Sequence, residues 1–320
     1  MSRLVAIKKR SVQSQANPAD LLEMPMANTA GNNLSSSSER PSGQTLIDML
    51  KEHLLFLVPF ALLLVFYAPV LYGLTFDWYD DPNYSHGFLV PLVSAFLLWQ
   101  KRKELLSAVS EVDYRGLILV IGGQLLFLVA NGAAEYFTLR LSFIITLFGL
   151  VWLLYGRRTV ALSWFEFGFL VFMIPIPYVI YYAATFPMQT LAAKATVGAL
   201  KAIGMGAVRQ GNIIHLQGTS LEVAEACSGL RSLVSLLALG ALYSYMTQKT
   251  LLPRALLFAS TVPIAIAGNV FRVFVTSLLV YTVSADITDE PLHSLMGLSV
   301  FVVAFLMLGV LGYIFRRVFR

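Results

Sequence analysis

The chain has little charge and a single cysteine. Only 13% of its 320 residues are Asp, Glu, Lys or Arg, whereas 57% are hydrophobic and the mean hydropathy is +0.72. This composition excludes a soluble globular domain and makes the bilayer the solvent of the protein. One cysteine excludes an intramolecular disulfide, and without CxxC pairs nothing indicates a structural zinc or iron–sulfur site. The sequence predicts no cofactor and no nucleic-acid partner.

The first 47 residues lack an apolar stretch long enough to be the core of a signal peptide. They are polar, with a serine run at Ser35–Ser38 and Pro, Asn and Gln throughout. Such a segment cannot bury enough apolar surface to fold. We therefore expect a disordered cytoplasmic tail over residues 1–47 and an integral membrane domain over residues 48–320.

Long apolar runs then follow one another along the chain. They predict an all-α polytopic membrane protein with about eight transmembrane helices. The expected spans are Leu54–Leu74, Gly87–Trp99, Gly116–Asn131, Leu141–Tyr155, Val160–Tyr182, Ser228–Met246, Ala255–Val283 and His293–Phe315. Pro175 and Pro177 should break the end of the fifth span, and Pro263 should kink the seventh.

The long segment before the sixth span has structure of its own. Phe186–Leu200 has the pattern of a helix lying in the membrane interface. Asn212–Val223 alternates in residue type around Gly218, which is typical of a short β-hairpin.

The distribution of lysine and arginine predicts the orientation. If the N-terminus is cytoplasmic, the cytoplasmic segments carry 17 of these residues and the opposite segments carry 4, among them Arg140 in the short loop Ala133–Arg140. Because cytoplasmic loops of membrane proteins are enriched in lysine and arginine, both termini are expected in the cytoplasm. The sixth helix then begins at the outer face of the membrane.

Cys227 is the candidate nucleophile, within the stretch Leu221–Leu233 that opens the sixth helix. A thiol reacts as the thiolate, and the helix start together with Arg231, one turn later, favours ionisation. Glu225 acts in the opposite direction, because a nearby carboxylate disfavours a second negative charge. The alternative is that Cys227 is a small buried apolar side chain.

Arg272 lies inside the seventh predicted span, where a charge costs about 2.5–3.5 kcal/mol or more unless it faces a partner or a water-filled cavity. It precedes the outer end, Val283, by 11 residues, or about 16 Å of regular helix. Asn269 shares its face and can hold the guanidinium or a substrate carbonyl. The competing explanation is an arginine that joins helices or caps carbonyls freed by Pro263.

Two histidines lie at the expected outer face. His293 begins the eighth span after an acidic loop, and an imidazole there can take a proton from a thiol and return it to a leaving amine. His86 begins the second span and can join the same cavity or only cap the helix. The nearby carboxylates Asp77, Asp80 and Asp81 are interpreted as solvated, so no metal is predicted.

These residues resemble the exosortase/archaeosortase family of integral membrane transpeptidases. The resemblance covers about residues 48–315 and rests on the eight-span layout and four sequence elements. These are ACSGLRSL at Ala226–Leu233, N-x-x-R at Asn269–Arg272, YSHG at Tyr84–Gly87, and His293 after an outer loop. The resemblance implies Cys227 as the nucleophile, Arg272 as the catalytic arginine and His293 as the third member. Substrate-binding or supporting roles then fall to Arg231, Asn269, Ser228 and His86.

The resemblance also implies the reaction. Family members cleave a C-terminal sorting signal, such as Pro-Glu-Pro followed by a transmembrane helix and a basic tail, through a thioester and pass the exported protein to a surface acceptor. The expected partners are the lipid bilayer, membrane-anchored substrates and an unknown acceptor. The expected place is a bacterial inner membrane with the active site on the periplasmic side.

Two other classes remain open from the residues alone. A transporter or flippase could use the intramembrane Arg272 and broken helices to line a substrate path, although no pair of matching broken helices indicates an inverted repeat. A noncatalytic scaffold would leave the arginine unexplained.

Overall fold

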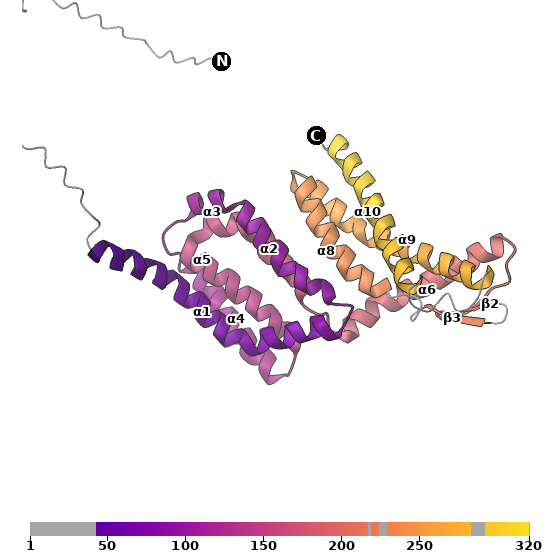
Figure 1. The fold of residues 1–320 in the computed structure, drawn as a ribbon, viewed down its shortest axis with the longest axis horizontal. Coiled ribbons are helices and arrows are strands. Elements are labelled where there is room, and N and C mark those ends of the chain that lie inside the picture. Colours follow the sequence, from indigo (N-terminus) through magenta and orange to yellow (C-terminus); the bar gives the residue numbers. More distant parts are fainter. Residues whose placement is uncertain (1–42, 217–218, 224–228, 283–291, 320) are drawn as a thin grey trace, which may run out of the picture. The chain divides into compact units, whose positions relative to one another are not determined.

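A computed structural model describes residues 43–216, 219–223, 229–282 and 292–319, with side chains except at 43–56, 229–232 and 292–300. The described chain is mostly helical and contains one small sheet (Figure 1). Its helical elements, in order, are α1 Gly43–Asp80, η1 Ser85–Phe88, α2 Leu89–Gln100, α3 Arg102–Ala108, α4 Arg115–Gly132, α5 Tyr136–Phe169, η2 Leu170–Met173, α6 Tyr178–Ala202, α8 Gly229–Thr247, α9 Leu251–Thr282 and α10 Leu292–Val318. The helical membrane class is therefore confirmed.

Five helical stretches in the described part of the chain are long and apolar enough to cross a membrane, fewer than the eight predicted spans. They are Leu57–Asp80, Arg115–Gly132, Tyr136–Met173, Leu251–Thr282 and Phe301–Val318. The second and sixth predicted spans correspond to two shorter apolar helices, Ser85–Gln100 and Leu233–Thr247. The fourth and most of the fifth predicted spans lie within the single stretch Tyr136–Met173.

The stretch Tyr136–Met173 folds back on itself at Gly156. This residue interrupts α5 with φ 82° and ψ 172°, a conformation that is essentially restricted to glycine. The rings of Phe148 and Phe167 lie 5.6 Å apart, whereas 19 residues of straight helix would separate them by about 28 Å. The two arms of α5 are therefore antiparallel, as two successive membrane spans would be.

Replacing Gly156 by alanine should destabilise the protein. A Cβ atom here would lie 1.9 Å from Ser110 Oγ, and the backbone conformation itself costs a non-glycine residue about 1–3 kcal/mol. We expect a lower midpoint of thermal unfolding in detergent. Gly122→Ala on α4 is the matched control, because nothing lies within 4 Å of its added Cβ. Equal midpoints for the two variants would contradict the fold-back.

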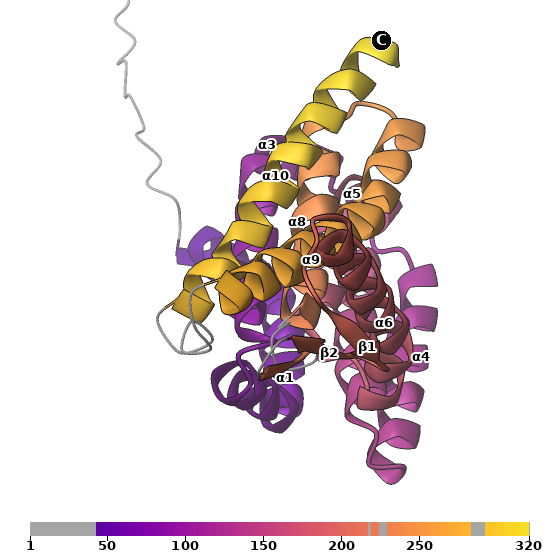
Figure 2. The same ribbon diagram turned by 90° about the vertical axis from the view of Figure 1, so that its right-hand side faces the viewer.

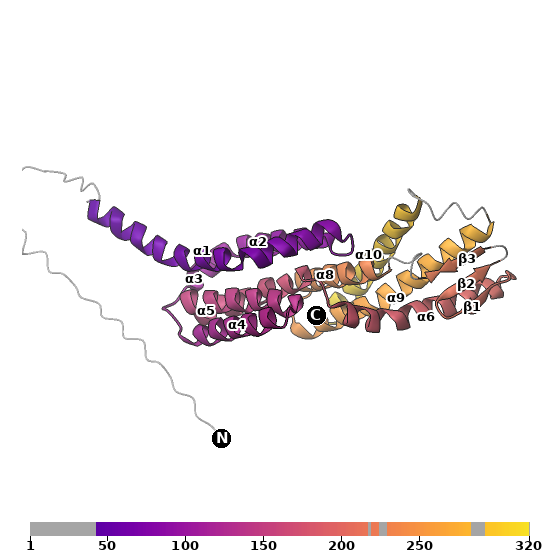
Figure 3. The same ribbon diagram turned by 90° about the horizontal axis from the view of Figure 1, so that it is seen from below.

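The first arm of α5 packs closely against α4 (Figure 3). Small residues allow this approach: a Cβ on Gly116 would lie 2.3 Å from the backbone of Leu153. Helix α1 joins them through the buried Tyr67, whose hydroxyl lies 3.0 Å from Ser142 Oγ. Because a polar group in an apolar layer needs a partner, this hydrogen bond fixes how α1 faces α5.

Glu135 caps the start of α5. Its carboxylate accepts hydrogen bonds from the backbone N–H groups of Phe137, at 3.0 Å, and Thr138, at 2.7 Å. The hydrogen bond from the Thr138 side chain makes the largest contribution to lowering the pKa of Glu135. The partial positive charge at the N-terminus of α5 also stabilises the negative charge of Glu135.

The segment between η2 and α8 differs in part from its prediction. The prolines end the preceding span as expected, but α6 begins at Tyr178 and is longer than the predicted Phe186–Leu200 helix. The hairpin is confirmed as β2, Ile213–Leu216, pairing with β3, Thr219–Glu222. A third strand, β1 Val208–Gln210, was not predicted and pairs with β2.

Helices α8, α9 and α10 pack on one another (Figure 2). Leu236, Leu257 and Leu308, one from each helix, are fully buried at their shared core. Gly240 lets α8 approach α9, because a Cβ there would lie 2.2 Å from Thr261 Oγ1. Helix α9 continues through Pro263 and also packs against α6.

Candidate functional site

The predicted nucleophile lies outside the described residues. Cys227 and Ser228 immediately precede α8, and Arg231 lies in the first turn of that helix. His293 lies in the first turn of α10, and its side chain is not among those described. The roles of these four residues stay predictions.

Arg272 and Asn269 are described and buried. Their exposed fractions are 2% and 5%, and Thr276, one turn after Arg272, is also buried. The spacing of three and four residues places the three side chains on one face of α9. Asn269 Oδ1 has no hydrogen-bond partner within the described part of the chain. Because an unsatisfied buried carbonyl is costly, Asn269 is a ready acceptor for an N–H group of a ligand.

His86 joins three elements. Its Nε2 lies 3.2 Å from the carbonyl oxygen of Phe172 in η2, and its Nδ1 lies 3.1 Å from Ser235 Oγ in α8. A carbonyl only accepts, so Nε2 carries the proton in this bond. In the neutral imidazole, Nδ1 then accepts from the Ser235 hydroxyl. The structure thus connects the predicted supporting residue His86 to α8, the helix that follows Cys227 in the sequence.

Ser235 was missed by sequence reasoning, although a signal was present. It follows Arg231 by four residues and Cys227 by eight. Side chains four residues apart lie on one face of a helix. This spacing places positions 231 and 235 on one face of α8.

A buried ion pair was also missed. Lys101 Nζ lies 2.8 Å from Glu166 Oε1, and Glu166 is fully buried. Lys101 also donates to the hydroxyl of Tyr245 in α8. The signal was a carboxylate inside a predicted span, because such a residue requires a partner.

The two connections to α8 fix its direction relative to α2. His86, just before α2, meets Ser235 near the start of α8, and Lys101, just after α2, meets Tyr245 near its end. The two helices therefore run parallel. The predicted membrane topology requires this, since it has both helices descend from the outer face to the cytoplasm.

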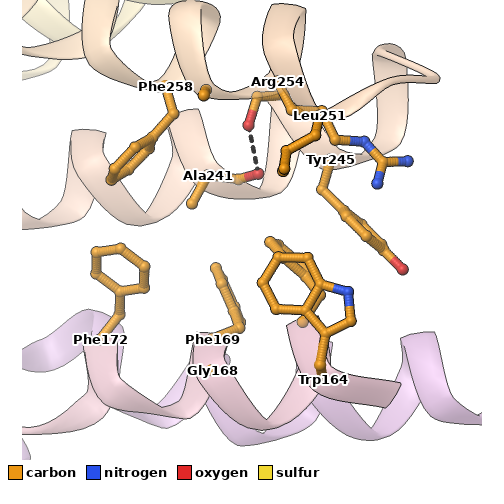
Figure 4. Close-up of a pocket in the computed structure, with 12 residues that line it drawn as sticks. Trp164, Gly168, Phe169, Phe172, Ala241, Tyr245, Leu251, Arg254 and Phe258 are labelled. Carbon is orange, nitrogen blue, oxygen red and sulfur yellow. Dashed lines mark hydrogen bonds between the residues drawn. The ribbon is translucent and has the colours of Figure 1, made fainter. Parts of the chain in front are cut away.

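A lateral groove of about 270 Å³ lies between α5 and η2 on one side and α8 and α9 on the other (Figure 4). Its walls are mainly aromatic and aliphatic, and Phe172 and Phe258 lie at one end. At the other end Arg254 stacks over the Tyr245 ring, 4.6 Å from its centroid. Phe172, which lines this end of the groove, also binds His86 through its backbone carbonyl.

The carboxylates near the end of α1 were predicted to be solvated, but one of them has a protein partner. Asp77 forms an ion pair with Arg140 at 2.5 Å, and Arg140 is buried within α5 rather than in a loop. No group of three potential metal ligands occurs among the described residues.

Long apolar helices, one of which buries an arginine and an asparagine, define a multi-pass membrane protein with polar groups in its interior. The family model of transmembrane exosortases (EpsH) matches residues 78–310, which include every predicted site residue. The chain belongs to the transmembrane exosortase family. Comparisons with curated proteins and with solved structures gave no match.

Proposed function

We propose that the protein is a cysteine-type membrane transpeptidase or peptidase. It cleaves C-terminal sorting signals of exported, membrane-anchored proteins at the outer face and transfers the exported part to a surface acceptor. The family match over residues 78–310 is the observation that carries this proposal. The buried polar face of α9 supports it, because arginine and asparagine are costly inside an apolar helix and such residues commonly mark a functional site.

In the proposed reaction, the Cys227 thiolate attacks the carbonyl carbon of the scissile peptide bond. The C–N bond then breaks, His293 gives a proton to the leaving amine, and the exported part remains as a thioester on Cys227. A nucleophile of the acceptor attacks the thioester, and the thiolate leaves. These steps require neither a metal ion nor an oxidant.

Arg272 would stabilise the oxyanion of the tetrahedral intermediates or hold the substrate backbone. Its burial is relevant, because a charge acts more strongly where water is excluded. Asn269, one turn earlier, would accept a hydrogen bond from a substrate N–H through Oδ1, which has no partner among the described residues. The pair would thus stabilise charge and orient the substrate.

His86 and Ser235 would position α8 rather than take part in the chemistry. Both imidazole nitrogens are engaged, one by the Phe172 carbonyl and one by Ser235. These hydrogen bonds connect α8 at Ser235 to η2 at Phe172. We therefore assign the proton transfer to His293.

The proposed topology places both termini in the cytoplasm of a bacterial inner membrane and the site on the periplasmic side. Reporter fusions after Arg158 and after Arg320, the last residue, should report the cytoplasm, because lysine and arginine concentrate on that side. A fusion within residues 284–292 should report the exterior. An exterior signal after Arg320 would overturn the topology and the outward position of Cys227.

The lateral groove would admit the membrane segment of the substrate. A substrate anchored in the bilayer can reach an internal site only between helices, and this groove opens between α5 and α8 and extends to Phe172, which binds His86. Its apolar walls suit a lipid-embedded helix. The groove therefore supports the proposed class of substrate.

Filling the groove should slow processing. Gly168 lines it, and nothing lies within 4 Å of an added Cβ, so Gly168→Leu should fold and narrow the groove. We expect at least about a tenfold lower rate, equivalent to an activation free energy about 1.4 kcal/mol higher. Gly122→Leu, at an open position on α4, is the matched control and should retain the native rate. Equal rates for both variants would contradict access through this groove.

The proposed function is tested by co-expressing the protein with a substrate that carries a sorting signal and following the size of the substrate. Shortening by the native protein and not by Cys227→Ala is the expected result. Equal shortening by both would contradict the cysteine mechanism and favour the transporter class.

A further inference from the structure

A second polar site lies at the opposite end of α8 from the cysteine motif. A crevice of about 510 Å³ is bounded by the turn from α8 to α9 and by the end of α10. Its charged lining residues are Lys249, Arg316 and Arg317, all exposed and all positive. The described residues 229–282 and 292–319 contain no Asp or Glu. The crevice therefore has a positive potential that no carboxylate of these three helices offsets.

The walls of this crevice are held together by a buried hydrogen bond. Gln248, which is buried, donates from Nε2 to the carbonyl oxygen of Gly312 at 3.1 Å. The backbone carbonyl of Gln248 accepts from Arg254 Nε at 2.8 Å. These contacts fix the turn against α10, so the positive side chains project from a formed surface.

Exposed apolar side chains flank the crevice residues in the chain, and the crevice lies at the ends of two candidate membrane spans. The candidate spans Leu251–Thr282 and Phe301–Val318 begin and end beside it. Leu251 and Leu252 at the start of α9 are 69% and 60% exposed. Tyr313, to whose hydroxyl Arg317 donates, adds the kind of amphipathic side chain that is enriched at interfaces.

We propose that this crevice binds the phosphate headgroup of an anionic phospholipid, with the acyl chains against the exposed apolar side chains beside it. The three positive side chains match the phosphate, and basic pockets at helix ends are suited to anionic headgroups. The exposed apolar side chains beside the crevice distinguish a lipid from a soluble phosphate, which would gain nothing from them. The crevice lies about 24 Å along α8 from Arg231, so this binding site is separate from the proposed chemistry.

The test uses the full chain purified in detergent and titrated with short-chain phosphatidylglycerol or phosphatidylcholine, with bound lipid counted by native mass spectrometry. Phosphatidylglycerol should bind more tightly. Each Lys or Arg near an anionic lipid contributes about 1 kcal/mol, so each neutralised residue should weaken binding about fivefold. Lys249→Gln with Arg316→Gln should therefore weaken it about 25-fold.

A matched variant separates this site from general surface charge. Arg157→Gln with Arg158→Gln removes the same charge from two exposed residues at the fold-back of α5, and it should leave the affinity unchanged. Equal losses in the two double variants would overturn the proposal. So would competition by glycerol 3-phosphate at the affinity of the lipid, since the site would then bind a free anion.

Discussion

Replacing Cys227 by serine should lower the rate of substrate processing by at least about 10³-fold. The change preserves the shape of the side chain but supplies a hydroxyl that ionises far less readily than a thiol. The reaction is measured with purified protein and a substrate that carries a sorting signal. Because Cys227 is the only cysteine, no second thiol can replace it.

The control for this variant is folding and insertion. Cys227→Ser should reach the membrane in the native amount and show the native unfolding midpoint, because the two side chains differ by one atom. Native processing by Cys227→Ser or Cys227→Ala would contradict the proposed mechanism.

His293 and Arg272 should differ in how their loss affects the pH dependence. His293→Ala should slow acyl-enzyme formation by about 10²–10⁴-fold, since general acid–base catalysis contributes about this much. Native processing should depend on pH near neutrality, where an imidazole titrates, and this dependence should disappear in His293→Ala.

Arg272→Lys should lower the rate by about 10²-fold, the effect of losing one donor to an oxyanion, and keep the native pH profile. Lysine retains the charge but not the planar fork of donors. Full activity of Arg272→Lys would favour a buried counter-charge, and native processing by His293→Ala would make His86 the next candidate.

Much of the fold could be predicted from local patterns. Apolar length located the helices, and the alternation around Gly218 located the hairpin that β2 and β3 form. The prolines at 175 and 177 marked the break before α6. These features depend on neighbouring residues, which is why the sequence is enough to identify them.

Features that depend on residues far apart could not be predicted. The third strand β1 exists because β2 offers it an edge, and short strands have weak patterns of their own. The buried Arg140 was assigned to a loop because its partner, Asp77, is distant in sequence.

The same division holds for the candidate site. The sequence identified Arg272 and Asn269 from the cost of polar groups in an apolar helix, and the structure shows both buried. It did not identify Ser235 or Tyr245, since their partners, His86 and Lys101, lie more than 140 residues away. Only the folded structure brings the two ends of α2 to these residues of α8.

The most direct test is to look for the thioester on Cys227. Purified protein is incubated with substrate without an acceptor, and the peptide that contains Cys227 is analysed by mass spectrometry before and after hydroxylamine. We predict an adduct with the mass of the exported part of the substrate, removed by hydroxylamine and missing from Cys227→Ser. Substrate cleavage without such an adduct would contradict the thioester mechanism.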